Sequence, residues 1–248
     1  MHETPIRVLV WDENAGHVSP LVYPRNIRGA VADGLLEMGG DHVQVHTASL
    51  DDPQQGLSEP ALKETDVLVY WGHVRHSEVS DETTARVTEH VRYRGLGFIA
   101  LHSAHYSKPF RCILNCTGHL KGGWRADEEP EEVHICAPHH PIAHGVRDFT
   151  LAQEEMYSAP FDVPPATVVV LQSHFTAGGE YFPSGLAWTV GAGIDPDFGS
   201  GPGQGVGQGE GLGRVFFLRP GHEYVPTYFN SDIRRILYNA VRWAAKRT

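Results

Sequence analysis

Cysteine is scarce: the 248-residue sequence contains only Cys112, Cys116 and Cys136. Three cysteines are too few for a disulfide framework, and the odd number leaves at least one thiol free in any pairing. Cys112 and Cys116 lie four residues apart and could share a helix face, but no second cysteine pair completes a zinc–thiolate site. We expect all three to pack as small, buried hydrophobic side chains.

Long apolar runs and clusters of basic residues are also missing. The longest apolar runs, such as residues 168–171, have the length of a strand, and the first residues lead into a charged strand without a signal-peptide pattern. Against 30 Asp and Glu there are 20 Lys and Arg, and the net charge of −10 would repel a phosphate backbone. We therefore expect a cytoplasmic protein that binds neither nucleic acid nor a membrane.

Glycine is concentrated in residues 191–213, which read GAGIDPDFGSGPGQGVGQGEGLG and can bury little apolar surface. This composition predicts a long, flexible hairpin loop. The segment matches neither GxGxxG nor a P-loop, so we expect no nucleotide cofactor. Its role is open: it could be inert, cover a neighbouring crevice, or contact a second subunit in a homo-oligomer.

With 41% hydrophobic residues, the chain is long enough to build one globular domain over residues 1–248. In the first half, short β-branched runs alternate with amphipathic stretches of helical spacing. Ser80 precedes the second of these stretches and is a suitable N-cap. The predicted strands span residues 6–11, 43–48, 66–71 and 97–101, and the predicted helices span residues 27–38 and 80–93.

Strands that are apolar throughout and separated by helices are typical of a parallel sheet covered by helices on both faces. The second half adds acidic and proline-rich segments among further strands, and a final helix whose apolar stripe should pack back onto the sheet. The chain is therefore predicted to be an α/β protein. The later strands are predicted over residues 133–136, 167–172, 185–190 and 214–218, and the final helix over residues 231–246.

Histidines follow three of the predicted strands at the point where each strand ends. The strand over residues 66–71 leads to His73, the next leads to His102, Ser103 and His105, and a late strand leads to His222 and Glu223. In open parallel α/β sheets, ligands bind outside the carboxyl ends of the strands, and neighbouring strands lie about 4.8 Å apart. If these three strands are neighbours, their terminal side chains converge on one crevice.

Each of these side chains also has a simpler explanation. His73 and His102 could do no more than hydrogen-bond to loop carbonyls, and His105 could line or cap the following helix. His76 lies at His-x-x-His spacing from His73, but two histidines without a nearby carboxylate are a weak metal signal. Ser103 could be a nucleophile activated by a histidine, although the GxSxG pattern is absent.

Two further clusters contain acids or histidines. Glu154 and Glu155 are adjacent in an extended segment, so their side chains point to opposite sides, and we expect Glu155 to face the crevice. Residues 139–145, which read HHPIAHG, have the composition of a metal-binding cluster, but the proline and glycine favour a turn instead.

Taken in order, several motifs resemble those of the ThuA-like family, the trehalose-utilisation proteins. The resemblance extends from Arg7 to about Ala244. The motifs that carry it are Tyr70-Trp71-Gly72-His73, Leu101-His102-Ser103-Ala104-His105, His140-Pro141-Ile142 with Gly145, Glu154-Glu155-Met156-Tyr157, and Gly213-Arg214-Val215-Phe216 leading to Pro220-Gly221-His222-Glu223.

This resemblance implies a flavodoxin-like fold related to the class I glutamine amidotransferases, a three-layer sandwich around a central, mostly parallel sheet. Those amidotransferases carry a cysteine at the sharp turn after a central strand, and a histidine and a glutamate after a late strand. His222 and Glu223 are similar in placement to the latter pair, whereas the turn after Leu101 has His102 and Ser103 and no cysteine. Because the thiolate nucleophile is missing, we do not expect glutamine hydrolysis.

The resemblance also implies a role in carbohydrate catabolism, through 3-keto sugar intermediates of disaccharides. One hypothesis is an enzyme that acts on a sugar or 3-keto sugar by isomerisation or by elimination and hydrolysis. His102, His222 and Glu155 would be its acid–base groups, or ligands of a divalent metal such as zinc. The alternative is a noncatalytic carbohydrate-binding or regulatory protein on the same scaffold.

The predicted metal ligands are His73, His102 and His222. The predicted substrate-binding residues are Trp71, His73, Ser103, His105, Tyr157 and Glu223, with Tyr106 and Tyr228 as further rings for stacking on a sugar.

Overall fold

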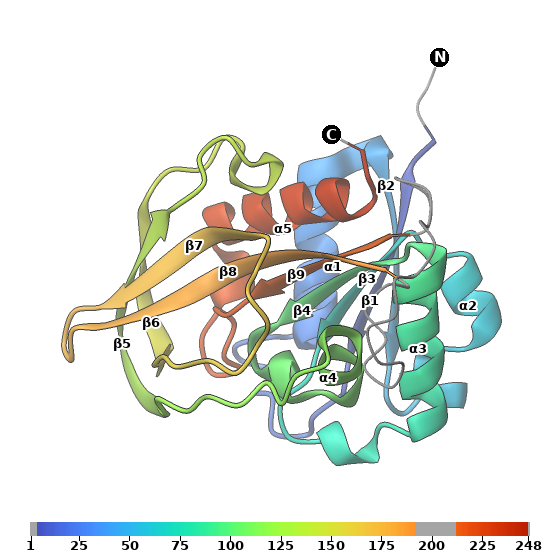
Figure 1. Cartoon of the computed structure of the whole chain (residues 1–248), viewed down its shortest axis with the longest axis horizontal. Helices are drawn as coiled ribbons and strands as arrows, with labels where there is room; N and C mark the ends of the chain where they lie inside the picture. Colours follow the sequence, from blue (N-terminus) through green and yellow to red (C-terminus); the bar gives the residue numbers. More distant parts are fainter. Residues whose placement is uncertain (1–3, 192–211, 248) are drawn as a thin grey trace, which may run out of the picture.

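The computed structural model describes residues 4–191 and 212–247. Within these ranges the chain forms one nine-stranded sheet with the strand order β2-β1-β3-β4-β9-β8-β7-β5-β6 (Figure 1). Most of the glycine-rich stretch 191–213 lies outside the described residues. The strands are β1 (Ile6–Asp12), β2 (Val43–Ser49), β3 (Val67–Trp71), β4 (Gly97–Leu101), β5 (Trp124–Ile135), β6 (Phe149–Tyr157), β7 (Val168–Phe175), β8 (Glu180–Val190) and β9 (Gly213–Leu218), and the α-helices are α1 (Asn26–Gly39), α2 (Glu59–Lys63), α3 (Asp81–Arg94), α4 (Lys108–Leu114) and α5 (Ser231–Ala244).

One half of the sheet is parallel, as predicted. β2, β1, β3, β4 and β9 are parallel neighbours, and every residue of β3 and β4 is buried. Burial on both faces explains why these strands are apolar along their whole length. The predicted bounds of β4 are confirmed, and Ser80 caps α3, its hydroxyl accepting a hydrogen bond from the backbone N–H of Thr83.

The other half of the sheet is antiparallel. β8 pairs antiparallel with β9, and β7, β5 and β6 follow in the same manner. The pairing of Val190 with Gly213 fits the predicted hairpin, whose loop lies outside the described ranges. β6 was not predicted as a strand, and β5 begins earlier than predicted, because both carry acidic residues where an apolar pattern was expected.

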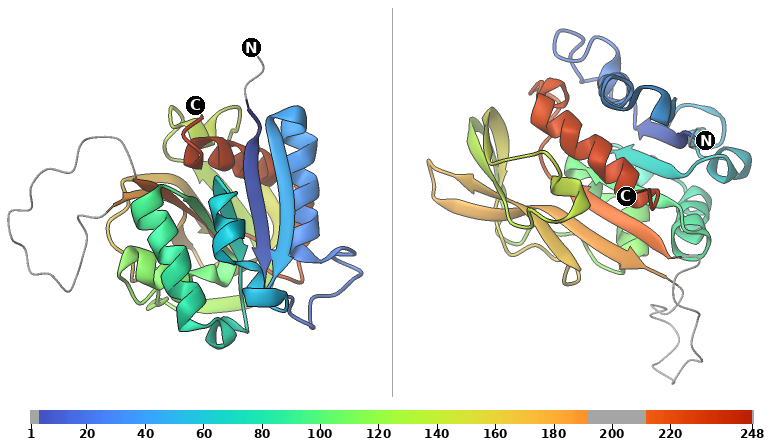
Figure 2. Two further views of the ribbon diagram at one scale, coloured as in Figure 1. Left: turned by 90° about the vertical axis from the view of Figure 1, so that its right-hand side faces the viewer. Right: turned by 90° about the horizontal axis from the view of Figure 1, so that it is seen from above.

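Helices cover the sheet on both faces, which confirms the three-layer architecture. α1 and α5 pack on one face, and α3 and α4 pack on the other, as both views of Figure 2 show. α5 begins at an Asn230 cap whose side chain accepts hydrogen bonds from the backbone N–H groups of Asp232 and Ile233. None of the helices in the described ranges combines the length and apolar character needed to cross a membrane.

The cysteines are not all buried, contrary to expectation. Cys112 and Cys136 are exposed and Cys116 is partly buried. Cys112 lies on α4, which turns Phe110 and Ile113 into the protein interior and leaves Cys112 on the outer side.

Replacing Gly97 with alanine should destabilise the fold, because α5 packs directly against the start of β4. A Cβ atom at position 97 would lie 2.7 Å from the Cβ of Ala244 and 3.1 Å from its carbonyl carbon. Overpacking of this kind costs about 1–3 kcal/mol, which urea denaturation would measure. Gly16→Ala is the matched control, since a Cβ there meets no atom within 4 Å. A Gly97→Ala protein as stable as the control would contradict this packing.

Candidate active site

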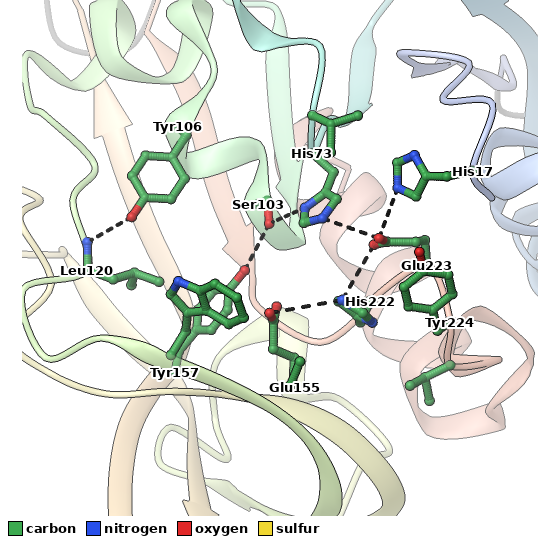
Figure 3. A pocket seen from close by; sticks show the side chains of 14 residues that line it. His17, His73, Ser103, Tyr106, Leu120, Glu155, Tyr157, His222, Glu223 and Tyr224 are labelled. Carbon is green, nitrogen blue, oxygen red and sulfur yellow. Dashed lines mark hydrogen bonds and ion pairs between the residues drawn. The ribbon is translucent and has the colours of Figure 1, made fainter.

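Three neighbouring strands end side by side at one edge of the sheet. Trp71 of β3 pairs with Leu101 of β4, and Leu101 pairs with Leu218 of β9. The predicted convergence is therefore confirmed, because the loops after these strands meet at this edge (Figure 3). They contribute His73, His102, Ser103, His222 and Glu223.

His102 occupies a sharp turn directly after β4. Its φ of +52° lies in the left-handed region, which non-glycine residues seldom adopt. The imidazole is completely buried, and its Nδ1–H donates to the carbonyl oxygen of Arg219 at 3.2 Å. In a neutral imidazole the other nitrogen is then a proton acceptor. Burial, reinforced by the nearby His73 and His222, lowers the pKa of His102 well below its usual value, so the ring stays neutral.

Glu155, from β6 in the other half of the sheet, lies against this imidazole. Glu155 Oε2 lies 3.3 Å from His102 Nε2, and Glu155 Oε1 lies 4.0 Å from His222 Nε2. Neither His102 Nε2 nor Glu155 Oε2 has a hydrogen-bond partner among the described residues, although both are buried. Two acceptor atoms that face each other in this way need a proton or a cation between them.

A hydrogen-bonded chain runs along the opposite wall of the site. Glu223 Oε1 lies 3.0 Å from His17 Nε2 and 3.2 Å from His73 Nε2. His73 Nδ1 lies 2.9 Å from the Ser103 hydroxyl, which lies 3.0 Å from the Tyr157 hydroxyl. Because an ionised carboxylate can only accept, His73 donates from Nε2, and in its neutral form Nδ1 accepts the proton of Ser103.

The two carboxyl groups of the site have very different pKa values. Burial raises the pKa of Glu155 to about 7 against the opposing charges of His73 and Arg219, and the charges of Glu223 and Glu154 add smaller raising effects. Burial alone would also raise the pKa of Glu223, but the hydrogen bond and charge of His73 outweigh it and lower that pKa to about 2. Glu223 in turn raises the pKa of His73 despite its burial. Two carboxyl groups with such different pKa values in one site indicate different roles in proton transfer.

A buried arginine holds both sides of the site in place. The guanidinium of Arg219 is fully buried, forms ion pairs with Glu131 and Glu154, and donates to the backbone carbonyl of Glu155. Glu154 also accepts a hydrogen bond from the backbone N–H of Gly221 at 3.0 Å. The network therefore ties Glu155 on β6 to the turn that carries His222 and Glu223. Of the two adjacent acids, Glu155 lines the cavity, as predicted, whereas Glu154 points into this network.

His73, Ser103, Glu155, His222 and Glu223 line a cavity of about 660 Å³ at the carboxyl edge of the sheet. The fully buried His102, a predicted catalytic residue, lies behind the cavity wall. Its aromatic walls include Trp124 and Tyr224, which are 60% and 52% exposed and can therefore contact a ligand. Among the described residues that line the cavity there is no lysine or arginine. The other lining residues are His17, Val74, Tyr106, Leu120, Ala126, Tyr157 and Val225.

Trp71, His105 and Tyr228, which were predicted to contact substrate, do not line the cavity. Trp71 is buried in the core beneath α1 and α5, and its indole N–H donates to the carbonyl oxygen of Gly221 at 3.2 Å. His105 is also buried, with Nδ1 only 2.6 Å from the carbonyl oxygen of Gly118, and burial lowers its pKa to about 3. Tyr228 is fully buried in the same core as Trp71. All three side chains support the fold behind the site.

The sequence suggested two sets of metal ligands, His102 and His222 with either Glu155 or His73. One ligand atom each from His102, Glu155 and His222 lie within 4.8 Å of one another. The ring nitrogens of His73 instead lie next to Ser103 and Glu223. A second group of this kind consists of His17, His73 and Glu223.

His17, Trp124 and Tyr224 line the cavity but were not predicted to do so. His17 follows β1, which lies next to β3, so the strand-end argument that selected His73 could have been extended to it. Trp124 and Tyr224 lie at the start of β5 and beyond β9, and no local pattern distinguishes them from other surface aromatics. The 139–145 run forms a short 3-10 turn, as expected, with His140 as its cap.

Comparison with known proteins agrees with this geometry. The family model described as trehalose utilisation, ThuA, matches residues 7–244. The chain belongs to the ThuA family. A search of curated proteins finds no match.

Two solved structures show how the ThuA-family fold recurs. A protein described as ThuA-like, from Bacteroides uniformis, is 14% identical, with a TM-score of 0.60 over 98% of this chain and 93% of that one. A glutamine amidotransferase from Thermotoga maritima is 10% identical, with a TM-score of 0.54 over 99% of this chain and 100% of that one. At these identities the likeness establishes the fold, which is the amidotransferase-like fold predicted from the motifs.

Proposed function

We propose that this ThuA-family protein is an enzyme that removes a proton from the carbon beside the keto group of a 3-keto sugar. This step begins both isomerisation and elimination of such a sugar. The observation that supports it most strongly is the pair of carboxyl groups in one cavity, Glu155 with a pKa of about 7 and Glu223 with a pKa of about 2. A group that titrates near neutral pH can both accept and release a proton during turnover.

Glu155 would be the base. The C–H bond beside the keto group breaks, its electron pair forms an enolate, and the proton moves to the Glu155 carboxylate. Negative charge then develops on the former keto oxygen. His73, whose raised pKa favours its cationic form, can stabilise this charge from the opposite wall, with Glu223 as its counter-ion.

The cavity also fits a neutral sugar in size and charge. A volume of about 660 Å³ lies within the range of small-molecule sites. Trp124 and Tyr224 offer exposed rings for the apolar face of a sugar. With two carboxyl groups and no cationic Lys or Arg among its described lining residues, the cavity should select unphosphorylated sugars over sugar phosphates.

As an alternative role for Glu155, we propose that His102, Glu155 and His222 hold a divalent metal, with zinc the best match to this donor set. Bound in this way, Glu155 would not be free to act as the base. Two imidazoles and one carboxylate are a donor set found in catalytic zinc sites. The buried and unpartnered His102 Nε2 and Glu155 Oε2 support this assignment. When bound, zinc would act as a Lewis acid on a substrate oxygen.

Deuterium exchange tests the proposed chemistry directly. Incubated with a 3-keto glucoside in D₂O, the protein should catalyse exchange of the hydrogen beside the keto group, as followed by NMR. If the metal is held there, elemental analysis should find one more divalent metal per chain in the purified protein than in His102→Ala or His222→Ala. A protein that binds the keto sugar and never exchanges this hydrogen would instead be the noncatalytic binding protein.

Trp124→Ala should raise KM for the sugar about two- to tenfold and leave kcat nearly unchanged. The ring lines the cavity and is largely exposed, and a stacked aromatic ring contributes roughly 0.5–1.5 kcal/mol. Tyr93→Ala, which removes a similarly exposed ring from α3, is the control and should change neither constant. A drop in kcat at constant KM would place Trp124 in the chemical step instead.

A further inference from the structure

A separate group of histidine and carboxylate side chains lies on the antiparallel half of the sheet. Glu132 and His134 come from β5 and His174 comes from β7, and one ligand atom from each lies within 4.8 Å of the others. We propose that these three residues, the β5–β7 cluster, bind a zinc ion independently of the candidate active site.

The register of the two strands brings the cluster together. Glu132 and His134 are two residues apart on β5, so their side chains project from the same face of the sheet. His174 lies directly opposite Glu132 in the β5–β7 ladder. The intervening Val133 is buried in the core, which leaves the cluster on the outer face. The backbone alone therefore places three potential ligands side by side.

Asp148 fixes the orientation of the His134 ring. Asp148 Oδ2 accepts a hydrogen bond from His134 Nδ1 at 3.0 Å, and Asp148 Oδ1 accepts one from the backbone N–H of Ile135 at 2.8 Å. An ionised carboxylate can only accept in these two hydrogen bonds. His134 Nε2 is left as the unprotonated nitrogen, 3.9 Å from Glu132 Oε2. Metal-binding histidines usually have such a carboxylate on their second nitrogen.

The His174 ring is also held in place. It stacks on Tyr181 with ring centroids 4.3 Å apart and an interplanar angle of 12°. Its Nδ1 lies 2.9 Å from Glu132 Oε2, so this carboxylate oxygen lies between the two imidazoles. Both rings therefore present a nitrogen to one carboxylate without any rearrangement of the backbone.

The distances and donor types fit zinc better than a harder cation. Four ligands about 2.1 Å from a tetrahedral zinc lie roughly 3.4 Å from one another, between the observed 2.9 and 3.9 Å. Imidazole nitrogens favour zinc and its transition-metal neighbours over magnesium or calcium. The partial exposure of the cluster leaves a fourth position for water or for a ligand from another molecule.

The cluster is far enough from the cavity for separate measurement. No residue of the cluster lines the cavity, and Glu132 lies six residues beyond Ala126 on β5, a span of at most roughly 20 Å at about 3.4 Å per residue. Zinc binding should therefore be titrated in a full-length His73→Ala/His102→Ala/His222→Ala protein, which lacks at least one imidazole of each candidate metal group of the cavity. Failure of the active-site proposal would not alter this titration.

Isothermal titration of that protein with zinc chloride should show one zinc per chain. His134→Ala and His174→Ala should each weaken binding at least tenfold, and Asp148→Asn should weaken it about 10- to 100-fold, as is usual for a group that orients a ligand. Zinc should also raise the Tm of the parent and of neither histidine variant, because a ligand that binds only the folded state stabilises it. His46→Ala, which removes an exposed histidine on β2, should bind as the parent does.

Two results would overturn the proposal. One is the absence of zinc binding by the parent protein, and the other is unchanged affinity in His134→Ala and His174→Ala. Circular dichroism and Tm without zinc show whether each variant is folded. Glu132→Gln, which keeps the side-chain shape and removes the charge, should also lose affinity if the loss is due to the missing ligand.

Discussion

Replacement of Glu155 by glutamine should lower kcat for a 3-keto glucoside by about 10²- to 10⁴-fold, the usual contribution of a positioned acid or base. Glutamine keeps the shape of the side chain but cannot take a proton from the substrate. In the parent protein, kcat/KM should rise as the pH passes through about 7, because the base must be ionised. The variant should lack this rise. Steady-state kinetics between pH 5 and 9 would measure both effects.

Glu155→Gln should also change how the stability of the protein depends on pH, and this can be measured without substrate. The Glu155 pKa is raised from 4.5 to about 7, so the folded protein binds this proton more tightly than the unfolded chain does. Its contribution to stability is therefore fully present below pH 4.5 and is lost as the pH rises towards 7. Glu155→Gln should remove this part of the pH dependence. Glu89→Gln, on the exposed side of α3, is the control and should change neither kinetics nor the stability profile.

Arg219→Met should destabilise the protein by about 3–5 kcal/mol, because it leaves Glu131 and Glu154 buried without their counter-ion. Urea denaturation at pH 8 would measure this loss. Lys63→Ala breaks an exposed ion pair with Glu59 and should cost at most about 0.5 kcal/mol.

Combining Arg219→Met with neutral replacements of its two partners shows whether the loss of stability comes from the unpaired charges or from altered packing. If the loss in Arg219→Met is electrostatic, neutralising both partners with Glu131→Gln and Glu154→Gln should recover part of the stability. The buried carboxylates that make the variant unstable would then be amides. A loss below about 1 kcal/mol in Arg219→Met would mean that the buried charges are solvated in some other way.

The parallel half of the fold was predictable because each strand and helix has a recognisable pattern in its own stretch of sequence. β3 and β4 are buried on both faces, so they are apolar throughout and easily recognised. The antiparallel half was harder to predict. Glu154 and Glu155 lie buried within β6, and their charge hides the apolar pattern of that strand. Only the three-dimensional structure shows that Arg219, far away in sequence, neutralises Glu154.

The candidate site was predictable where it depends on strand ends. His73, His102 and the His222-Glu223 pair all follow parallel neighbours, and topology alone brings them together. Trp71 was misassigned because the last residue of a strand can point into the core as readily as into a site. The pairing of His73 with Glu223 depends on side-chain geometry that spacing does not reveal.

The left-handed backbone conformation at position 102 does not depend on histidine being the residue there. The φ of +52° directly after β4 places the side chain at position 102 against Glu155, behind the cavity wall. Residues branched at Cβ are disfavoured there, whereas glycine, asparagine and aspartate are tolerated. Exchange of one reactive group for another at position 102 would need a new side chain and no new backbone. Divergence of chemistry on this scaffold could therefore proceed by single substitutions at a turn that is already built.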